Sequence, residues 1–554
     1  MGPVTATRGA ASEALAVRRR WNGLGAGTER GGLRVGLLAS YTVDPLIPPL
    51  GVALHDAGVP ARPFTGPYNQ IAQTCLSDEN EFARQNPDVL VVLPRFEELA
   101  PETWREDLSM TCEAATAAAE RRRACLVFVL PALPEARPYG VFEAARTADG
   151  SAAYTAAREQ LRARLAGRPN VLIADAEEAV RALGARRVQR PSLYRYAKVP
   201  YSDEVFLALA GQLRGLLRHR YAGSPRAAVV DLAGLGPEPA AAVETLRDAL
   251  LELPRSGRGL AVRGHAAAEG RAAAEATAPE LLLEARAVCL DDRPLDVQLS
   301  GLARKLGVRT AELALLTADP EAAAVAQRGG AVPCLLPEDD PDRWPEVILA
   351  AGVFDAFPDG ACAAAGTVDP SNGPDRPAAG APTGLSLERF IAGLGLNVVF
   401  SDAEHAPGGA EAVRGTIVRA HDFTLGTEDG LAVEAAGRGG ESDDREIFAG
   451  HVTDRLGDYG AAAAVRVAYT ASTAAVDVFS ISCPAMGRGV EDAVLLELIE
   501  RADRRGCAEL VFEVRDTGRN SVAVEYLRGV AAREWSGPSR RPISLRIADA
   551  RPAG

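Results

Sequence analysis

The chain has 554 residues, a length that indicates about three domains, since single domains usually hold about 100–200 residues. Hydrophobic residues make up 47% of it and charged residues 24%, which is typical of a globular protein. The 61 basic and 74 acidic side chains give a net charge of −13, which argues against a general binder of nucleic acid or anionic membranes. We therefore expect no nucleic-acid partner and no membrane partner.

The eight cysteines are scattered without a CxxC pair, so a zinc ribbon or a disulfide framework is not expected. No apolar run approaches the roughly 18–20 residues needed to cross a bilayer. Residues 1–32 are rich in Arg, Gly and Ala and lack the apolar core of a signal peptide. These features predict a cytoplasmic protein with a disordered leader over residues 1–32.

Residues 33–222 alternate short apolar runs with alanine-rich stretches, which predicts a parallel α/β domain. The expected strands are Leu33–Ser40, Asp88–Pro94, Ala124–Pro131 and Asn170–Asp175. A basic segment near the end of this region contains Arg181, Arg186, Arg187, Arg190, Arg195 and Lys198. It is either a solvated face or a surface that docks an acidic carrier protein.

Residues 223–356 repeat the pattern, which indicates a second doubly wound domain. Its expected strands are Ala227–Ala233, Gly259–Arg263, Ala287–Asp291, Leu313–Thr317 and Val332–Leu336. Residues 357–384 have the composition of a flexible linker.

Residues 385–554 have expected strands at Ala462–Thr470, Ala475–Ile481 and Glu509–Val514, and a helix at Val490–Arg505 behind a glycine turn. This order predicts an α+β domain. The fold class is thus α/β, with two Rossmann-like doubly wound domains followed by an α+β domain.

Asp231 ends the apolar run VVDLAGLG, at the sheet edge where ligands of open α/β domains bind. From position alone it is either a catalytic group or a capping residue. The order of the surrounding segments narrows the choice.

Five linked segments resemble the FkbH-like branch of the haloacid dehalogenase superfamily: VVDLAGLG (229–236), LAVRGH (260–265), LDDRPLDVQLSGLARKLGV (290–308), LALLTADPEAAAV (313–325) and AVPCLLPEDDPDRW (331–344). The resemblance implies a phosphoryl-transfer domain in which Asp231 is the nucleophile and a ligand of Mg²⁺.

Several positions depart from the family pattern: Ala233 replaces the general acid, Gly264 the serine, Arg293 the lysine, and Thr317 and Ala318 the metal-binding Asp pair. Mg²⁺ usually needs one or two carboxylates beside phosphate oxygens. Loss of the acid alone removes a rate factor on the order of 10²–10⁴. We therefore expect Mg²⁺ binding to be weak or absent and the site to be inactive, with Asp319 as the alternative, shifted metal ligand.

The flanking regions extend the resemblance. SYTVDPLIPPL (40–50) and GPYNQIAQ (66–73) look like the SGNH-like amino-terminal part of FkbH proteins, with Ser40 and Asn69 as polar candidates. YSDEVF (201–206) contains no histidine, so a working Ser-His pair is not expected. Binding of a substrate or partner is the expected role of this domain.

DRLGDYG (454–460), SCPAMGRGVE (482–491), RDTGRN (515–520) and AHDFTLGT (420–427) are similar to the family's GNAT-like acyltransferase region. The resemblance implies that Gly487, Arg488 and Gly489 cradle an acyl-pantetheine thioester, the one cofactor expected. Pro484 stands where the family has arginine. Cys483 is the candidate nucleophile, and its alternative is a small buried cysteine. His421 and His451 are expected to be surface or structural residues and not catalytic bases.

The resemblance implies a role in bacterial polyketide or natural-product biosynthesis with an acyl carrier protein or a biosynthetic enzyme as partner. Three hypotheses follow. The first is acyl transfer to or from the carrier protein by the last domain, and the second is a noncatalytic pseudoenzyme that binds the carrier protein or a partner enzyme. The third is a Mg²⁺-dependent glyceryltransferase or phosphatase.

Overall fold

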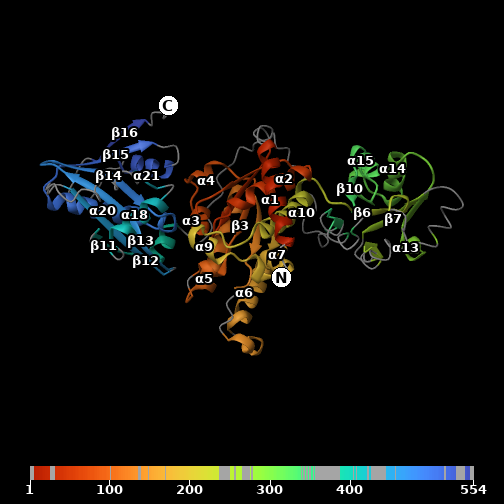
Figure 1. Ribbon diagram of the computed structural model, residues 1–554, viewed down its shortest axis with the longest axis horizontal. Coiled ribbons are helices and arrows are strands. Elements are labelled where there is room, and N and C mark those ends of the chain that lie inside the picture. Colours follow the sequence, from red (N-terminus) through yellow and green to blue (C-terminus); the bar gives the residue numbers. More distant parts are fainter. Residues whose placement is uncertain are drawn as a thin grey trace.

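The computed structural model describes residues 5–24, 32–235, 258–264, 279–337, 387–403, 409–420, 445–516, 520–531 and 543–549, except positions 100, 135–138, 148, 169 and 456, together with short pieces between these ranges. Each of its three sheets forms a separate lobe (Figure 1). The lobe with β1–β5 lies in the middle, and the other two flank it (Figure 1). The predicted linker, 357–384, lies outside the described residues.

The first sheet is parallel and has the order β2-β1-β3-β4-β5. Its strands are β1 (Leu33–Ala39), β2 (Ala61–Thr65), β3 (Val89–Leu93), β4 (Cys125–Leu130) and β5 (Val171–Asp175). Its helices are α2 (Ile47–Asp56), α3 (Ile71–Leu76), α4 (Glu81–Arg84), α5 (Trp104–Arg122), α6 (Gly150–Leu165), α7 (Ala176–Leu183), α8 (Ala185–Val188), α9 (Pro191–Ala197) and α10 (Asp203–Tyr221). The sequence did not indicate β2, whose segment ARPFT carries Arg and Pro; both residues suit the edge of the sheet, where β2 lies.

Residues Thr5–Leu24 form a helix, α1, so the prediction of a disordered leader is wrong for this segment. Trp21 of α1 packs so closely on Gly51 of α2 that a side chain at Gly51 would meet the indole ring at 2.1 Å. Because Gly51 has no side chain, the Trp21 indole packs directly on the backbone of α2. Burial of the indole stabilises α1, which is polar over most of its length.

The second sheet is also parallel, with the order β10-β9-β6-β7-β8. Its strands are β6 (Ala227–Asp231), β7 (Gly259–Gly264), β8 (Ala287–Leu290), β9 (Leu313–Thr317) and β10 (Val332–Leu335). Its described helices include α13 (Pro279–Glu284), α14 (Leu295–Leu306) and α15 (Pro320–Arg328). Each strand begins at the first residue of a predicted apolar run. The inner strands β6, β7 and β9 are buried on both faces, so their sequences are largely continuous hydrophobic runs.

The third sheet is mixed, with the order β11-β12-β13-β14-β15-β16. Its strands are β11 (Asn397–Asp402), β12 (Arg445–Asp454), β13 (Gly457–Tyr469), β14 (Thr473–Ile481), β15 (Glu509–Asp516) and β16 (Ile543–Asp549). Its described helices include α17 (Leu387–Gly393), α18 (Gly409–Arg419), α20 (Val490–Arg504) and α21 (Ser521–Ala531). Two parallel α/β sheets followed by an α+β domain confirm the predicted fold class.

The first and last lobes touch through polar contacts. Arg455 donates to Asp107 of α5 at 2.7 Å, and Arg84 of α4 forms an exposed ion pair with Glu525 of α21. These contacts place the end of β12 and its following turn against the first domain.

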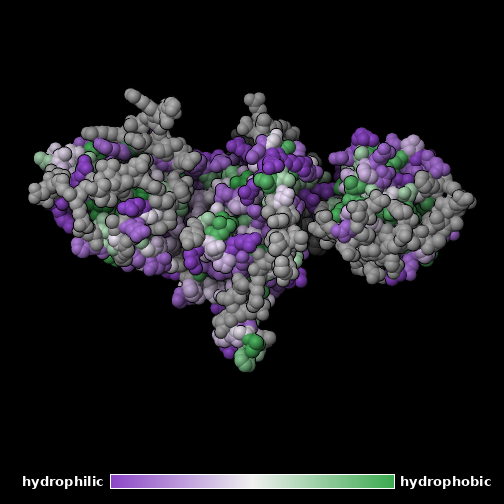
Figure 2. Space-filling view, in the orientation of Figure 1, coloured by the Kyte–Doolittle hydropathy of each residue, from purple (hydrophilic) through white to green (hydrophobic). Residues whose placement is uncertain are grey.

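On the face shown in Figure 2, the described residues are largely hydrophilic, with an apolar tip on the narrow projection below the middle lobe. The 3-10 helix η3 (Gly140–Ala145) carries two of the most exposed apolar side chains among the described residues, Val141 at 90% and Phe142 at 73%. Among the described residues, no helix combines the length and the apolar character that a membrane span requires.

Candidate functional site

The predicted nucleophile Asp231 ends β6, and its side chain is only 1% exposed. The register between β6 and β7 places Arg263 directly beside it, with Nη1 3.1 Å from Asp231 Oδ2. Thr317, at the end of β9, donates its hydroxyl to the same oxygen at 3.0 Å, and the amide of Gly234 donates to Oδ1 at 3.1 Å. Three donors from the domain itself therefore hold both carboxylate oxygens.

Arg263 supplies the positive charge that a metal would otherwise bring to Asp231. Burial raises the pKa of Asp231, while the guanidinium and the hydroxyl of Thr317 act in the opposite direction. Arg263 is part of β7, so its guanidinium cannot leave the site and exchange with water as a bound metal ion can. The Asp231 carboxylate therefore forms an ion pair within the domain.

The other predicted phosphoryl-transfer residues do not join this group. Asp319 accepts from the amide of Glu321 at 2.8 Å and so caps α15, while its own amide donates to Thr317. Arg293 is exposed and pairs with Asp291, with Nε 2.9 Å from the carboxylate. Among Thr317, Asp319 and Arg293, only Thr317 therefore contacts Asp231.

These surroundings do not fit Mg²⁺, which prefers several oxygen ligands. One carboxylate, one hydroxyl and a guanidinium contact one another at Asp231. In the described part of the chain, no group of three or more His, Cys, Asp or Glu side chains could hold a metal ion. We derive no metal-dependent step at this site.

Sequence reasoning missed Arg263, although a signal was present. The run LAVRG is apolar on both faces of the sheet except at Arg263, and a charged side chain in such a strand needs a buried partner. The alignment of β7 with β6 then makes Asp231 the partner.

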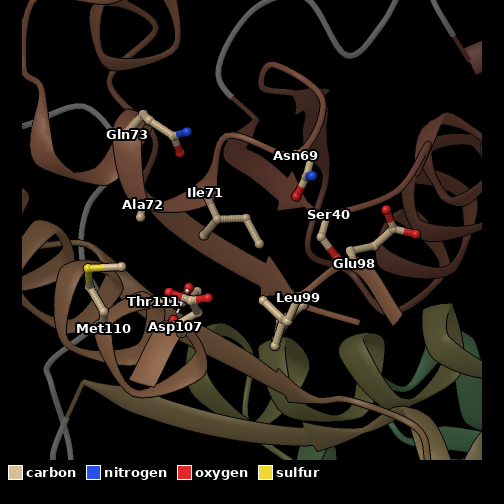
Figure 3. Close-up of a pocket in the computed structure, with 11 residues that line it drawn as sticks. Ser40, Asn69, Ile71, Ala72, Gln73, Glu98, Leu99, Asp107, Met110 and Thr111 are labelled. Carbon is tan, nitrogen blue, oxygen red and sulfur yellow. Dashed lines mark hydrogen bonds between the residues drawn. The ribbon is translucent and has the colours of Figure 1, made fainter. Parts of the chain in front are cut away.

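The first domain contains a small pocket of about 40 Å³ at the carboxyl ends of β1 and β3, which is the point where the strand order reverses. Figure 3 shows Ser40 and Asn69 at one end of it and Asp107, Thr111 and Met110 at the other. Ser40 is 3% exposed, and its hydroxyl has no hydrogen-bond partner among the described residues. No histidine is among the described lining residues, so the pocket offers Ser40 no imidazole base.

Both carboxylates of the pocket are already engaged. Arg95 and the Tyr194 hydroxyl hold Glu98, and Arg455 of the last domain holds Asp107. Burial raises the pKa of Asp107, and the guanidinium of Arg455 partly offsets that effect. The pocket therefore suits a small neutral group with hydroxyl or amide functions.

The predicted cradle in the last domain has the expected backbone shape. Gly487 and Gly489 have φ values of 69° and 91°, in the left-handed region that favours glycine, and Gly489 is the N-cap of α20. Arg488 points inward and is 0% exposed. Its Nη1 lies 2.9 Å from Asp454, and its Nε donates to the Pro484 carbonyl at 2.9 Å. It is therefore a structural ion-pair partner of the turn.

Cys483 is half-buried, whereas the other described cysteines are buried. It is the first residue of a three-residue 3-10 turn, η7 (Cys483–Ala485), and α20 begins only at Val490. So short a turn supplies little of the helix dipole that lowers the pKa of catalytic thiols. The site residues Cys483, Gly487 and Gly489 thus lie on one connection, between β14 and α20.

Of the two histidines expected to have no catalytic role, the structure describes His451. His451 lies 2.9 Å from the exposed carboxylate of Asp458, on neighbouring strands of the sheet. His421 lies outside the described residues.

No protein-family model matches the chain, and neither does any curated protein sequence. Among solved structures, the chain is similar to the N-terminal part of protein BF1531 from Bacteroides fragilis, which contains a phosphatase domain complexed with Mg. The identity is 14%, the match covers 60% of this chain and 98% of that chain, and the TM-score is 0.47.

A second similar structure is the ribosomal-protein-S18-alanine N-acetyltransferase from Escherichia coli, at 21% identity, with 25% of this chain and 80% of that chain covered and a TM-score of 0.19. A third is a transcriptional regulator from Bacillus halodurans, at 17% identity, with 26% and 98% covered and a TM-score of 0.18. At these identities the likenesses concern the fold alone.

Proposed function

We propose that this protein binds an acyl carrier protein or a partner enzyme of bacterial natural-product biosynthesis and transfers no phosphoryl group. It is then a pseudoenzyme that keeps a phosphatase-like fold as a scaffold. The FkbH-like sequence resemblance supports the biosynthetic setting and the carrier-protein partner.

The observation that carries this proposal is the pair between Asp231 and Arg263, at 3.1 Å. A nucleophile must be free to approach phosphorus, and its site must hold a cation that also contacts the phosphate oxygens. Here the cation is a side chain buried beside the carboxylate. The likeness to a phosphatase domain therefore supports an inherited fold and not an inherited reaction.

Two surface features suit a partner. Arg181, Arg190 and Arg195 are exposed on or beside α7 and α9, and their charge would attract an acidic carrier protein in spite of the net negative charge. The apolar tip at Val141 and Phe142 offers contact area that water covers in the isolated chain.

The second candidate is acyl transfer through Cys483. The observation in its favour is that this thiol is the one described cysteine that is not buried. In such a reaction the Cys483 sulfur would attack a thioester carbonyl, form a new thioester, and release the donor thiol with the proton.

Intact-mass measurement separates these functions. The protein is mixed with carrier proteins that bear different acyl thioesters, and complex formation is followed in parallel by native mass spectrometry. The proposal predicts complexes without a covalent adduct. An acyl adduct that disappears in Cys483→Ser, with Cys507→Ser as the matched cysteine control, would favour acyl transfer and overturn the noncatalytic role.

A further inference from the structure

The parallel strands β14 and β15 separate partway along their length. Their pairing joins Thr473–Val476 to Glu509–Phe512, and no further ladder between them is present in the described residues. Beyond this point the β14 edge that faces β15 would present unpaired N–H and C=O groups. Such an edge binds an extended, amide-bearing chain by adding it as a strand.

That edge is occupied by the protein itself. The amide of Leu425 donates to the Phe479 carbonyl at 3.1 Å, and the amide of Ile481 donates to the Phe423 carbonyl at 3.0 Å. Ser480 forms a bridge to Thr424 on this side and pairs with Ala464 of β13 on the other. Residues 423–425 therefore lie as a short antiparallel strand on the β15 side of β14.

Side chains fix this short strand in place. Phe423 is buried, with its ring centroid 5.2 Å from that of Phe479 and 5.6 Å from that of Tyr526. Asn520, also buried, donates its side-chain amide to the Thr424 carbonyl at 3.0 Å. The segment is thus held by the core and by α21, in addition to β14.

The backbone amides of the glycine turn, residues 487–489, also have an internal partner, the side chain of Glu491. The amide of Gly487 donates to Glu491 Oε1 at 2.6 Å, and the amides of Gly489 and Glu491 also act on this carboxylate. Burial raises the pKa of Glu491, while these amides favour its charged form. A helix N-terminus with a glycine turn is a typical phosphate site, and here its donors already face an anion.

The first domain contacts the glycine turn through Gln70. A side chain at Gly487 would meet Gln70 Oε1 at 2.3 Å, so the residue before α3 lies directly against the turn. Gln70 is itself buried and adjoins Asn69 and Ile71 of the pocket in the first domain. The Gln70 side chain therefore covers the Cα side of Gly487.

We infer that the chain occupies its own thioester groove: the Glu491 carboxylate takes the place of a diphosphate, and residues 423–425 take the place of the extended thioester arm. The last domain therefore excludes diphosphate-bearing thioesters of the coenzyme A type. This inference goes beyond the proposed function and is independent of carrier-protein binding.

Calorimetric titration with coenzyme A and with inorganic pyrophosphate tests it on the full chain. The variants are Glu491→Ala, which opens the turn, and Asp492→Ala, which removes the same charge one residue away, where the carboxylate accepts from Tyr526. We expect the parent and Asp492→Ala to show no saturable binding up to about 1 mM, and Glu491→Ala to bind pyrophosphate at least about tenfold more tightly. Saturable coenzyme A binding by the parent would overturn the inference, as would a folded Glu491→Ala that gains nothing.

Should Glu491→Ala fail to fold, hydrogen exchange on the parent decides. The amides of Leu425, Ile481 and Gly487 are expected to be protected without any ligand, because each donates to a fixed internal acceptor. Exchange at the rate of an unstructured peptide at these three amides would show an open groove and contradict the inference.

Discussion

At the scale of single residues, the carboxylate of Asp231 forms an ion pair with the guanidinium of Arg263, 3.1 Å away. Arg263 lies in register with it on the next strand, and the pair is almost completely buried. A buried ion pair contributes little net stability as a pair, but removal of one partner leaves a buried charge without compensation. Arg263 is therefore expected to be required for folding.

Replacing Arg263 by alanine tests that requirement. We expect Arg263→Ala to lower the free energy of unfolding by about 3–5 kcal/mol, measured by chemical denaturation. Arg293→Ala, which removes an exposed partner of Asp291, should leave stability nearly unchanged. Equal stability of the two variants would mean that Arg263 does not compensate the buried negative charge of Asp231.

The sequence was sufficient to place Asp231 at a strand end, because that position follows from a local apolar run. The assignment of Ala233 to the position of the family's acid came from the FkbH-like resemblance. It did not reveal the partner of Asp231, because the distance to Arg263 is set by the register of two strands that are far apart in the chain. Glu491 was missed for a related reason: only the backbone of the turn shows that its amides converge on that carboxylate.

At the scale of elements, α10 connects the first two domains. Its Arg218 donates to the Ala351 carbonyl at 3.0 Å, and its His219 lies 3.2 Å from the Ser224 hydroxyl. Burial lowers the pKa of His219 from its ordinary 6.5, and the neighbouring guanidinium of Arg258 lowers it further against a weaker opposing effect of Asp355. The folded chain therefore favours the neutral imidazole.

A pH dependence follows from this lowered pKa. A histidine with a depressed folded pKa contributes stability above its unfolded value of 6.5, and that stability is lost as the pH falls through the folded pKa. We expect the parent to lose stability between about pH 7.5 and pH 5.5 more steeply than His219→Gln, as measured by thermal melting. The exposed control His55→Gln should follow the parent, and a His219→Gln melt that does so too would contradict the prediction.

Elements that are buried on both faces were predictable, as β3, β4, β6 and β9 show, because their sequences are continuous apolar runs. The strands β2, β11 and β12 were not indicated, since each contains charged or polar residues and lies at or near a sheet edge. Helix α1 was missed because its stability depends on Trp21 reaching Gly51 of another element.

At the scale of the whole molecule, the ion pair between Arg455 and Asp107 joins the first and last domains. Asp107 is buried, so loss of Arg455 leaves a carboxylate with one strong donor fewer. We expect Arg455→Ala to weaken the union of the two domains by about 2 kcal/mol, visible as an earlier, separate melting transition of the last domain. Arg84→Ala, which removes an exposed pair across the same contact, should melt like the parent.

The proposed docking of an acidic carrier protein is tested at the scale of the molecular surface. Reversal of two exposed charges in Arg190→Glu/Arg195→Glu should slow association about tenfold at low salt, with the difference shrinking as salt is added. Arg304→Glu/Arg328→Glu reverses two exposed charges at the ends of α14 and α15 and serves as a control with the same change of net charge. Association rates from stopped-flow fluorescence that fall equally in both variants would show that the basic segment is not the docking surface.

We propose that Asp231 does not support phosphoryl transfer, because the Arg263 guanidinium lies beside its carboxylate, where a metal ion would bind. The most direct test is the rate of hydrolysis of an acyl phosphate as Mg²⁺ is added, for the parent and for Asp231→Asn. We predict the same background rate for both proteins at every Mg²⁺ concentration. Turnover that saturates with Mg²⁺ in the parent and disappears in Asp231→Asn would contradict the account.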